Sequence, residues 1–136
     1  MNRRVTTLDA SDTVIDALRV MTEKGVGCVV ITSDSRPVGI LTERDVMKTM
    51  MRGNEVLRNK LSGVMSLPLT TVPPDTPVVE ALNLMMKKNI RRLPIVSDGV
   101  LQGIITIHQD LLYWALAAAS GNSSSLEYSN GPLSRP

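Results

Sequence analysis

Aromatic side chains are almost missing from this chain. Its 136 residues include no Phe, one Trp and two Tyr, so Val, Ile, Leu, Met and Ala must build the core. A surface that stacks the bases of single-stranded nucleic acid needs aromatic residues that this sequence lacks. The formal net charge of +2 is also too small to indicate general nucleic-acid binding. We therefore rank nucleic acid last among the ligand classes, in spite of the basic pairs Lys87-Lys88 and Arg91-Arg92.

Cysteine, histidine and long apolar runs are equally scarce. Cys28 is the only cysteine and cannot form an internal disulfide, which fits a reducing cytoplasm. His108 is the only histidine, with no Cys, Asp or Glu in a metal-ligand spacing and no recognisable nucleophile beside it. No apolar run approaches the roughly 18 residues of a membrane span, and no signal-type core follows Met1–Arg4. We expect a cytoplasmic protein that is neither an enzyme nor a metal or membrane protein.

What the sequence does contain is an internal repeat with a spacing of 64 residues. Val5–Met21 aligns without a gap with Leu69–Met85, and the similarity returns between Gly39–Thr42 and Gly103–Thr106. The identical pairs include Thr6/Thr70, Thr7/Thr71, Val14/Val78, Ala17/Ala81, Leu18/Leu82 and Met21/Met85. Each copy alone would leave an apolar face uncovered, so the repeat indicates a pseudo-twofold module with a ligand-sized cleft between its halves.

The first copy predicts two helices around a pair of strands. A helix is expected after a cap at Asp12 or Thr13 and before a stop at Gly25. Its buried stripe has the spacing i, i+3, i+4, i+7 and consists of Val14, Ala17, Leu18 and Met21. The apolar runs 28–31 and 38–41 predict two strands joined by a turn. Thr42 is expected to cap a second helix that ends near Met51.

The second copy follows the same order. Asp75 or Thr76 is expected to cap its helix, with Pro77 in the first helical position. The matching stripe consists of Val78, Ala81, Leu82 and Met85. Strands are predicted at 93–96 and 100–105 around a hairpin turn, followed by a helix over 110–119. The predicted fold is α/β, with two βαββα repeats (1–52 and 65–119) related by a pseudo-twofold axis, a connector (53–64) and a flexible tail (120–136).

This pattern resembles the cystathionine-β-synthase (CBS) domain pair, or Bateman module, over about residues 5–118. The resemblance depends on several motifs in order: Ala-Leu at 17–18 and 81–82, Gly39–Asp45, Met65-Ser66 followed by Leu69–Val72, and Ile90–Val96. It implies a protein that binds AMP, ADP, ATP or S-adenosylmethionine in clefts between paired repeats. It also implies that the protein regulates a partner and does not catalyse a reaction.

Thr42 and Asp45 are the residues whose own chemistry points to a ligand. Their spacing places a hydroxyl and a carboxylate on adjacent turns at the start of a helix. The carboxylate can accept hydrogen bonds from both hydroxyls of a ribose, while the hydroxyl and free backbone N–H groups suit a phosphate. The alternative is that Thr42 only caps the helix and Asp45 only complements the helix dipole.

The resemblance implies that this site takes its opposite wall from the second copy. Arg91 and Arg92 would address phosphate, although one of the two could instead be a solvated surface residue. Backbone groups near Thr70 and Val72 would meet the adenine edge. The expected main cleft consists of Ile40, Thr42, Arg44, Asp45, Thr70, Thr71, Val72, Ile90, Arg91, Arg92 and Pro94.

The mirror-related cleft departs from this pattern at two points. Asp110 comes one residue late relative to Thr106, which rotates its carboxylate by about 100° around a helix. Gly27 and Cys28 stand where the main cleft has its arginine pair. We expect a weaker second site, made of Thr6, Thr7, Val26, Cys28, Thr106, His108 and Asp110.

The leading hypothesis is a regulatory adenine-nucleotide sensor that needs no cofactor besides its ligand and acts through an unidentified partner protein. An excess of apolar surface at 111–116 and at Met47, Met50 and Met51 predicts a homodimer. The alternative hypothesis is a ligand-independent interaction or dimerisation scaffold with the same fold.

Overall fold

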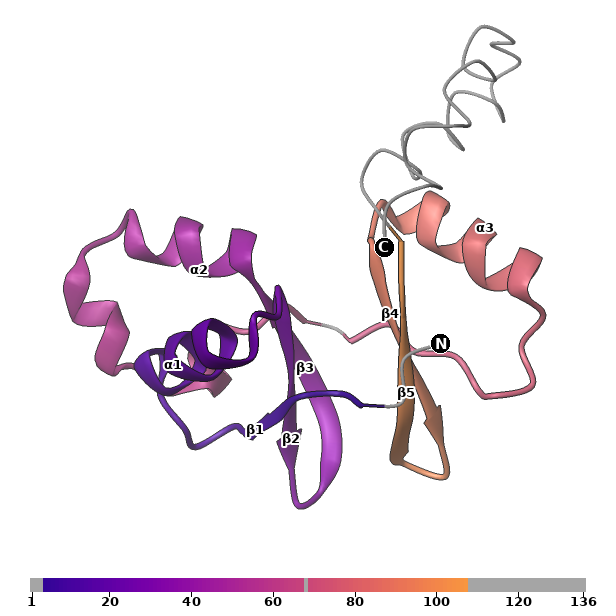
Figure 1. Ribbon diagram of the computed structural model, residues 1–136, viewed down its shortest axis with the longest axis horizontal. Helices are drawn as coiled ribbons and strands as arrows, with labels where there is room; N and C mark the ends of the chain where they lie inside the picture. Colours follow the sequence, from indigo (N-terminus) through magenta and orange to yellow (C-terminus); the bar gives the residue numbers. More distant parts are fainter. Residues whose placement is uncertain (1–3, 68, 108–136) are drawn as a thin grey trace, which may run out of the picture.

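The computed structural model describes residues 4–67 and 69–107, which form two halves that lie side by side (Figure 1). The first half contains β1 (Thr7–Asp9), α1 (Val14–Lys24), β2 (Cys28–Ser33), β3 (Arg36–Thr42), α2 (Glu43–Met50) and two 3₁₀-helices, η1 (Asn54–Arg58) and η2 (Leu61–Gly63). The second half contains α3 (Val78–Lys88), β4 (Arg92–Ser97) and β5 (Val100–Thr106). The predicted α/β class and repeated order of helix, strand and strand are confirmed. The helix predicted over 110–119 and the tail over 120–136 lie outside the described residues.

Each half is built on an antiparallel hairpin, β2–β3 in the first and β4–β5 in the second. The turn of the first hairpin has positive φ at Asp34 and Ser35 (51° and 65°), and the second has it at Asp98 and Gly99 (52° and 78°). Two successive positive φ values define a type I′ turn, whose twist matches that of the strands it joins. The register also shifts once in each hairpin, at positions 64 residues apart. The sequence repeat is therefore reproduced down to the backbone of its turns.

The first strand of the repeat forms fully in the first half. β1 lies parallel to β2 at one edge of a three-stranded sheet. The outer hydrogen bonds of this pairing run from Val30 N–H to Thr6 C=O (3.0 Å) and from Ala10 N–H to Thr32 C=O (2.8 Å). Both bonds need a backbone N–H on the donor residue.

In the second half the matching residues are prolines, and the strand is lost. Pro94 stands 64 positions after Val30, and Pro74 stands 64 positions after Ala10. Proline has no backbone N–H to donate, so both outer bonds are impossible. Only the inner bonds of Val72 form, and the structure has an isolated parallel bridge between Val72 and Ile95. The second sheet therefore has two strands where the first has three.

The two helices of the first half begin in the same way. Thr13 and Thr42 are their N-caps, and each forms a reciprocal capping box with the aspartate three residues later, Asp16 or Asp45. Of the two residues expected to cap α1, Thr13 is the N-cap and Asp12 is not. The prediction that Thr42 caps its helix is confirmed.

Helix α3 begins differently from the prediction. Pro77 is its N-cap and not its first helical residue, and no side chain caps the helix. Neither Asp75 nor Thr76 takes that role, because the Thr76 hydroxyl donates to a carbonyl of the preceding turn at 2.8 Å. The hydroxyl is therefore used before the helix begins.

Two apolar clusters, one in each half, form the core. The buried members are Val14, Ala17, Met21, Val29, Ile31, Leu41, Val46 and Leu61 in the first half, and Val72, Ala81, Met85, Leu93, Ile95 and Ile107 in the second. Leu18 and Leu82 pack against these clusters and are partly buried. Full burial of a Val, Leu, Ile or Met side chain contributes about 1.5–3 kcal/mol.

Val78 departs from the predicted buried stripe, because 70% of its surface is exposed. Its counterpart Val14 is fully buried beneath the predicted connector. There Val14 N–H donates to Asn59 C=O at 3.0 Å, Leu61 joins the same cluster, and η1 contacts both α1 and α2. The connector is thus part of the first half's core.

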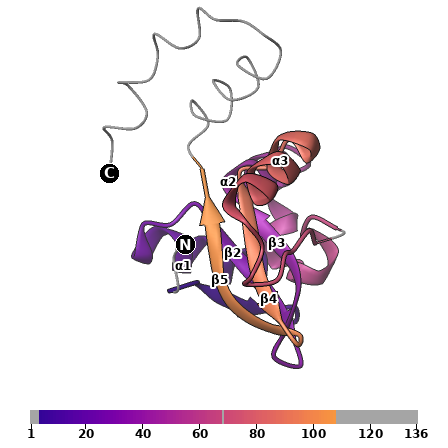
Figure 2. The same ribbon diagram turned by 90° about the vertical axis from the view of Figure 1, so that its right-hand side faces the viewer.

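The segment that joins the halves is anchored at both ends. Ser66 N–H donates to Ile40 C=O at 3.0 Å, which ties this segment to β3. Met65, the residue before Ser66, packs against Gly39 of β3. A Cβ at position 39 would lie 2.5 Å from the Met65 sulfur, so the glycine leaves room for this side chain. Val72 ties the other end to β4. β3 and β5 contact each other, so the hairpins face one another across the junction (Figure 1, Figure 2).

Across residues 4–67 and 69–107, no helix combines the length and the apolar character needed to cross a bilayer.

Candidate functional site

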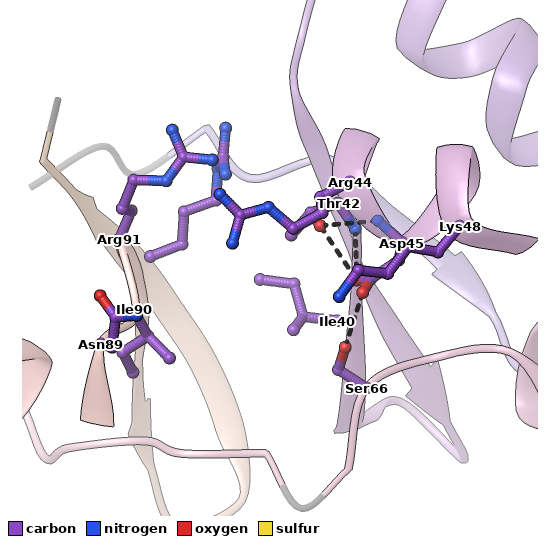
Figure 3. A pocket seen from close by; sticks show the side chains of 10 residues that line it. Ile40, Thr42, Arg44, Asp45, Lys48, Ser66, Asn89, Ile90 and Arg91 are labelled. Carbon is purple, nitrogen blue, oxygen red and sulfur yellow. Dashed lines mark hydrogen bonds between the residues drawn. The ribbon is translucent and has the colours of Figure 1, made fainter. Parts of the chain in front are cut away.

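A cleft of about 260 Å³ opens between the two halves. Figure 3 shows its two walls, one from β3 and α2 and the other from the segment that follows α3. The lining residues are Ile40, Thr42, Arg44, Asp45, Lys48, Ser66, Asn89, Ile90, Arg91 and Arg92. Because the walls belong to different repeats, a molecule bound here would contact both halves.

Asp45 is held in a fixed position in the first wall. Its Oδ2 accepts hydrogen bonds from the Thr42 N–H and the Thr42 hydroxyl, both at 3.0 Å. Its Oδ1 accepts a third bond, from the Ser66 hydroxyl at 3.1 Å (Figure 3). A carboxylate offers about four acceptor positions, so about one position, on Oδ1, is left for a ligand.

The second wall is positioned by the end of α3. Asn89 adopts the left-handed conformation (φ 53°) that stops the helix, and Ile90 N–H closes its last turn at 3.0 Å. The chain then turns into β4. As a result Ile90 and Arg91 lie across the cleft from Ile40 and Arg44 (Figure 3).

Four basic side chains line the cleft, Arg44 and Lys48 from α2 and Arg91 and Arg92 from the second wall. Partial burial lowers the pKa of Arg91, and the positive charges of Arg92 and Arg44 lower this pKa further, while Glu43 acts in the opposite direction. Arginines from the two halves are therefore near enough to repel one another. An anion between them would relieve that repulsion.

Arg92 lies against the first half as well as lining the cleft. A Cβ on Gly27 would lie 2.6 Å from Arg92 Nη2 and 3.1 Å from Glu43 Oε1, so the glycine leaves room for the guanidinium. Burial raises the pKa of the neighbouring Cys28 thiol, and Arg92 beside it lowers that pKa in part. Arg92 thus connects β4 with the start of β2.

The structure brings together most of the residues predicted for the main cleft, namely Ile40, Thr42, Arg44, Asp45, Ile90, Arg91 and Arg92. Thr70, Thr71, Val72 and Pro94 are not among its lining residues. Val72 N–H donates to Pro94 C=O at 3.2 Å, and Val72 C=O accepts from Val96 N–H at 2.9 Å. Backbone groups expected to meet adenine are therefore used inside the second half, where Val72 and Pro94 are buried.

Three lining residues were missed by the sequence analysis: Lys48, Ser66 and Asn89. Lys48 follows Asp45 by three positions, and that helical spacing could have placed it on the same face. Asn89 is a residue type that ends helices in the left-handed conformation, so the sequence gives no separate sign that it lines a cleft. Ser66 carried no local signal for contact with Asp45, because the two are 21 residues apart.

The residues predicted for the second cleft are more dispersed. Thr7 and Val26 line two different cavities, one beside the turn of the first hairpin and the other between α1 and α2. Thr106 is exposed at the end of β5 and pairs with Arg92 in the sheet. Thr6 C=O accepts from Val30 N–H, and Cys28 lies beside Arg92. His108 and Asp110 lie outside the described residues.

Within the described ranges 4–67 and 69–107, no group of three or more His, Cys, Asp or Glu side chains could hold a metal ion.

Comparison with known proteins identifies the family. The CBS domain family matches residues 1–52 and 61–109. The chain therefore belongs to the CBS domain family, and the two matches correspond to a tandem pair of CBS domains. This confirms the resemblance seen in the repeat.

Relatives and solved structures agree with this assignment. An uncharacterized protein of Methanopyrus kandleri is 43% identical over 113 residues, which cover 81% of this chain and 57% of that protein. A CBS domain-containing protein of Bacillus subtilis is 32% identical over 108 residues, covering 79% of this chain and 76% of that protein. The crystal structure of an uncharacterized conserved protein from Pyrococcus horikoshii matches with a TM-score of 0.70 and 26% identity, covering 88% of this chain and 87% of that chain. The chain spans 50–58% of the length of the first curated relatives that it matches.

Proposed function

We propose that this CBS pair binds an adenosine nucleotide in the cleft between its halves and acts as a regulatory sensor, not as an enzyme. CBS-pair proteins are commonly regulatory nucleotide-binding modules. The observation that carries the proposal is the composition of the cleft, where a fixed carboxylate, two apolar side chains and four basic side chains meet from both repeats. The three groups suit a ribose, a base and a phosphate respectively.

Each part of the nucleotide has a suitable partner in the cleft. The remaining acceptor position of Asp45 Oδ1 can take a ribose hydroxyl, and a second hydroxyl can replace that of Ser66. Ile40 and Ile90 face one another across the cleft and can sandwich the base (Figure 3). The guanidinium groups of Arg91 and Arg44 can donate paired hydrogen bonds to phosphate oxygens.

We propose a weaker second site around Thr106 and Asp110, as expected from the sequence.

Regulation follows from the two-walled construction. A ligand that contacts both halves stabilises the relative orientation in which both walls fit it. Helices α1, α2 and α3 move with their halves, so a partner bound to them would respond to the ligand. The reacting groups of an enzyme are not needed for this mechanism.

The proposal is tested by calorimetric titration with adenosine, AMP, ADP and ATP, using Asp45→Asn and Asp16→Asn as a matched pair. Asp16 forms the same capping box at α1, with Thr13 N–H and Thr13 hydroxyl both 3.0 Å from Oδ2, and it does not line the cleft. Both substitutions weaken a helix cap, but only Asp45→Asn removes the negative charge and one of the two acceptor oxygens from the cleft. We expect Asp45→Asn to reduce affinity about ten- to a hundredfold and Asp16→Asn to leave it within about twofold.

Equal losses from the two substitutions would mean that the effect arises from helix capping, and the assignment of Asp45 to the ligand would be wrong. Absence of binding by every adenosine compound to the wild-type chain would reject the function itself. Thermal unfolding of both variants, measured alongside, shows whether their capping losses are comparable.

A second candidate function, a ligand-independent interaction scaffold, is favoured by one observation. Met47, Met50 and Met51 on and after α2 expose 69%, 39% and 87% of their surfaces. Beside them a cavity of about 530 Å³ lies between α1 and α2. Methionine side chains adapt to varied apolar partners, and a homodimer through this face would cover them.

This interface is tested by light scattering on the wild-type chain and on Met47→Lys. We expect a wild-type dimer that Met47→Lys converts to monomer, while Val79→Lys, at an equally exposed position on α3 (70%), has no effect. A wild-type monomer would reject the homodimer. A dimer that binds no nucleotide would favour the scaffold.

A further inference from the structure

Basic side chains from both halves meet at one side of the cleft. Arg44 and Lys48 lie on α2, and Arg91 and Arg92 lie where the second wall enters β4. Figure 3 shows the Arg44 and Arg91 side chains reaching toward each other from opposite walls. Two independent parts of the fold therefore direct positive charge into one space.

The acidic groups of the cleft do not balance this charge. Of the ten lining residues four are basic, and Asp45 is the single acidic one. The Asp45 carboxylate already accepts three hydrogen bonds from Thr42 and Ser66. Glu43 lies near Arg91 without lining the cleft, and offsets part of the excess. A concave site with this balance has a positive potential that attracts multivalent anions.

We propose that the cleft selects its ligand by the number of phosphates, and takes a nucleoside di- or triphosphate in preference to a monophosphate or S-adenosylmethionine. The proposal deepens the proposed function and rests on it, because it names the class of adenosine ligand. A single phosphate group carries a charge of about −1.5 to −2, so it cannot balance the four basic side chains that line the cleft. A chain of two or three phosphates presents oxygens to Arg44 and Lys48 on one wall and to Arg91 on the other.

S-adenosylmethionine is disfavoured by the same arrangement. Its sulfonium group places a positive charge next to the adenosine, where a nucleotide has its first phosphate. The four basic side chains that attract phosphate repel a cation at that position. The cleft thus distinguishes between ligands that share the adenosine part.

The test is a calorimetric titration of the full chain with adenosine, AMP, ADP, ATP, GTP, inorganic triphosphate and S-adenosylmethionine, at about 50 mM and about 300 mM salt. We expect ADP or ATP to bind at least about tenfold more tightly than AMP, and S-adenosylmethionine to bind more weakly than adenosine. The ratio between ATP and AMP should shrink at the higher salt concentration, because screening weakens the contribution of the additional charges.

Charge-removing variants locate the effect. Arg44→Gln and Lys48→Gln should each lower the ATP/AMP affinity ratio severalfold and change adenosine binding little. Arg58→Gln on η1 and Lys87→Gln on α3 remove the same charges from exposed positions outside the cleft and should keep the wild-type ratio. Thermal unfolding of each variant shows whether the fold is retained.

The outcomes separate this proposal from the proposed function. Equal affinities for AMP, ADP and ATP would overturn the selection by phosphate number and leave adenosine binding in place. Equal binding of GTP, inorganic triphosphate and ATP would support the selection and reject adenine recognition. A ratio that falls as much in Arg58→Gln as in Arg44→Gln would show a general charge effect and would also overturn the proposal. No binding of any of these compounds would reject both.

Discussion

The first half of this CBS pair has a three-stranded sheet and a helix whose first residue, Val14, is buried. In the described part of the second half the sheet has two strands, and the first residue of the matching helix, Val78, is exposed. The two halves nevertheless share the same hairpin turns, the same register shifts and matched core residues. The differences trace to single residues, such as Pro74 and Pro94 in place of Ala10 and Val30. The repeat therefore preserves the architecture, while substitutions at a few positions decide whether a third strand can hydrogen-bond to the hairpin.

The same comparison explains why the two sides of the junction differ in charge. At matched positions the second half has Arg91 and Arg92, and the first half has Gly27 and Cys28. Because Gly27 has no side chain, the Arg92 guanidinium can lie directly beside its backbone. The small residues of the first half thus leave room for the arginines at the matched positions of the second half. The cleft lined by basic residues therefore forms on the side of the junction to which Arg91 and Arg92 belong.

The largest effect is expected from removing matched core side chains. Leu93→Ala in the second half should lower the free energy of unfolding by about 2–5 kcal/mol, because the fully buried Leu93 would leave a cavity. Val29→Ala at the matched position should cost about 1 kcal/mol less, since a smaller side chain is removed. Chemical denaturation measures both. A single transition in both variants would show that the halves unfold together, and two transitions would show that they do not.

Gly39→Ala should have the next largest effect. A Cβ there would lie 2.9 Å from Met65 Cγ and 3.2 Å from Met65 Cβ, so Met65 must move away from β3. We expect a loss of about 1–3 kcal/mol in the free energy of unfolding, as for other overpacked sites. Gly63→Ala is the control, because no atom lies within 4 Å of its new Cβ. Equal stability of the two variants would show that the joining segment moves freely over the first half.

Pro94→Val tests why the second sheet lacks a strand. The substitution supplies an N–H that can donate to Thr70 C=O, as Val30 N–H donates to Thr6 C=O. We expect a change of at most about 1 kcal/mol in stability but clear protection of the new amide in hydrogen exchange. Rapid exchange at that amide would mean that proline is not what prevents the strand from forming.

The smallest effect concerns Cys28 and the neighbouring arginine. Burial raises the pKa of this thiol, so its alkylation should be slow at neutral pH and become faster as the pH rises. Arg92 lowers the same pKa, so Arg92→Gln should move the midpoint of the pH–rate profile upward. The limiting rate at high pH reports the exposure of the thiol separately. A downward shift without a rise in that limiting rate would contradict the contact between Arg92 and Cys28.

Much of the fold was predictable because periodicity and turn chemistry are local. The helices ending at Lys24 and Lys88 and both hairpins follow from apolar spacing and from residues that tolerate positive φ. The cap at Pro77 and the exposure of Val78 were not predicted, because they depend on which other segments cover the helix. The missing strand could have been predicted, since both prolines stand in the sequence.

The candidate site was predictable where a motif lies within one element. Thr42 and Asp45 are three residues apart, and Ile90–Arg92 form one continuous segment. The bond from Ser66 to Asp45 joins residues far apart in the chain and depends on the path of the joining segment. The role of Val72 was not predictable in this way, because its backbone pairs with β4, a contact between segments that are far apart in the chain.

The joining segment has a further consequence for any molecule that binds both walls. Ser66 is bonded to the first half and Val72 to the second, and the five positions 67–71 lie between these anchors. At about 3.3–3.6 Å per residue, such a length allows the anchors to separate by about 20 Å at most. The two walls therefore remain at a high effective concentration relative to each other. Opening of the cleft is then mainly a rotation of one half relative to the other about this short segment. Closing the cleft around a ligand therefore costs little conformational entropy of the protein.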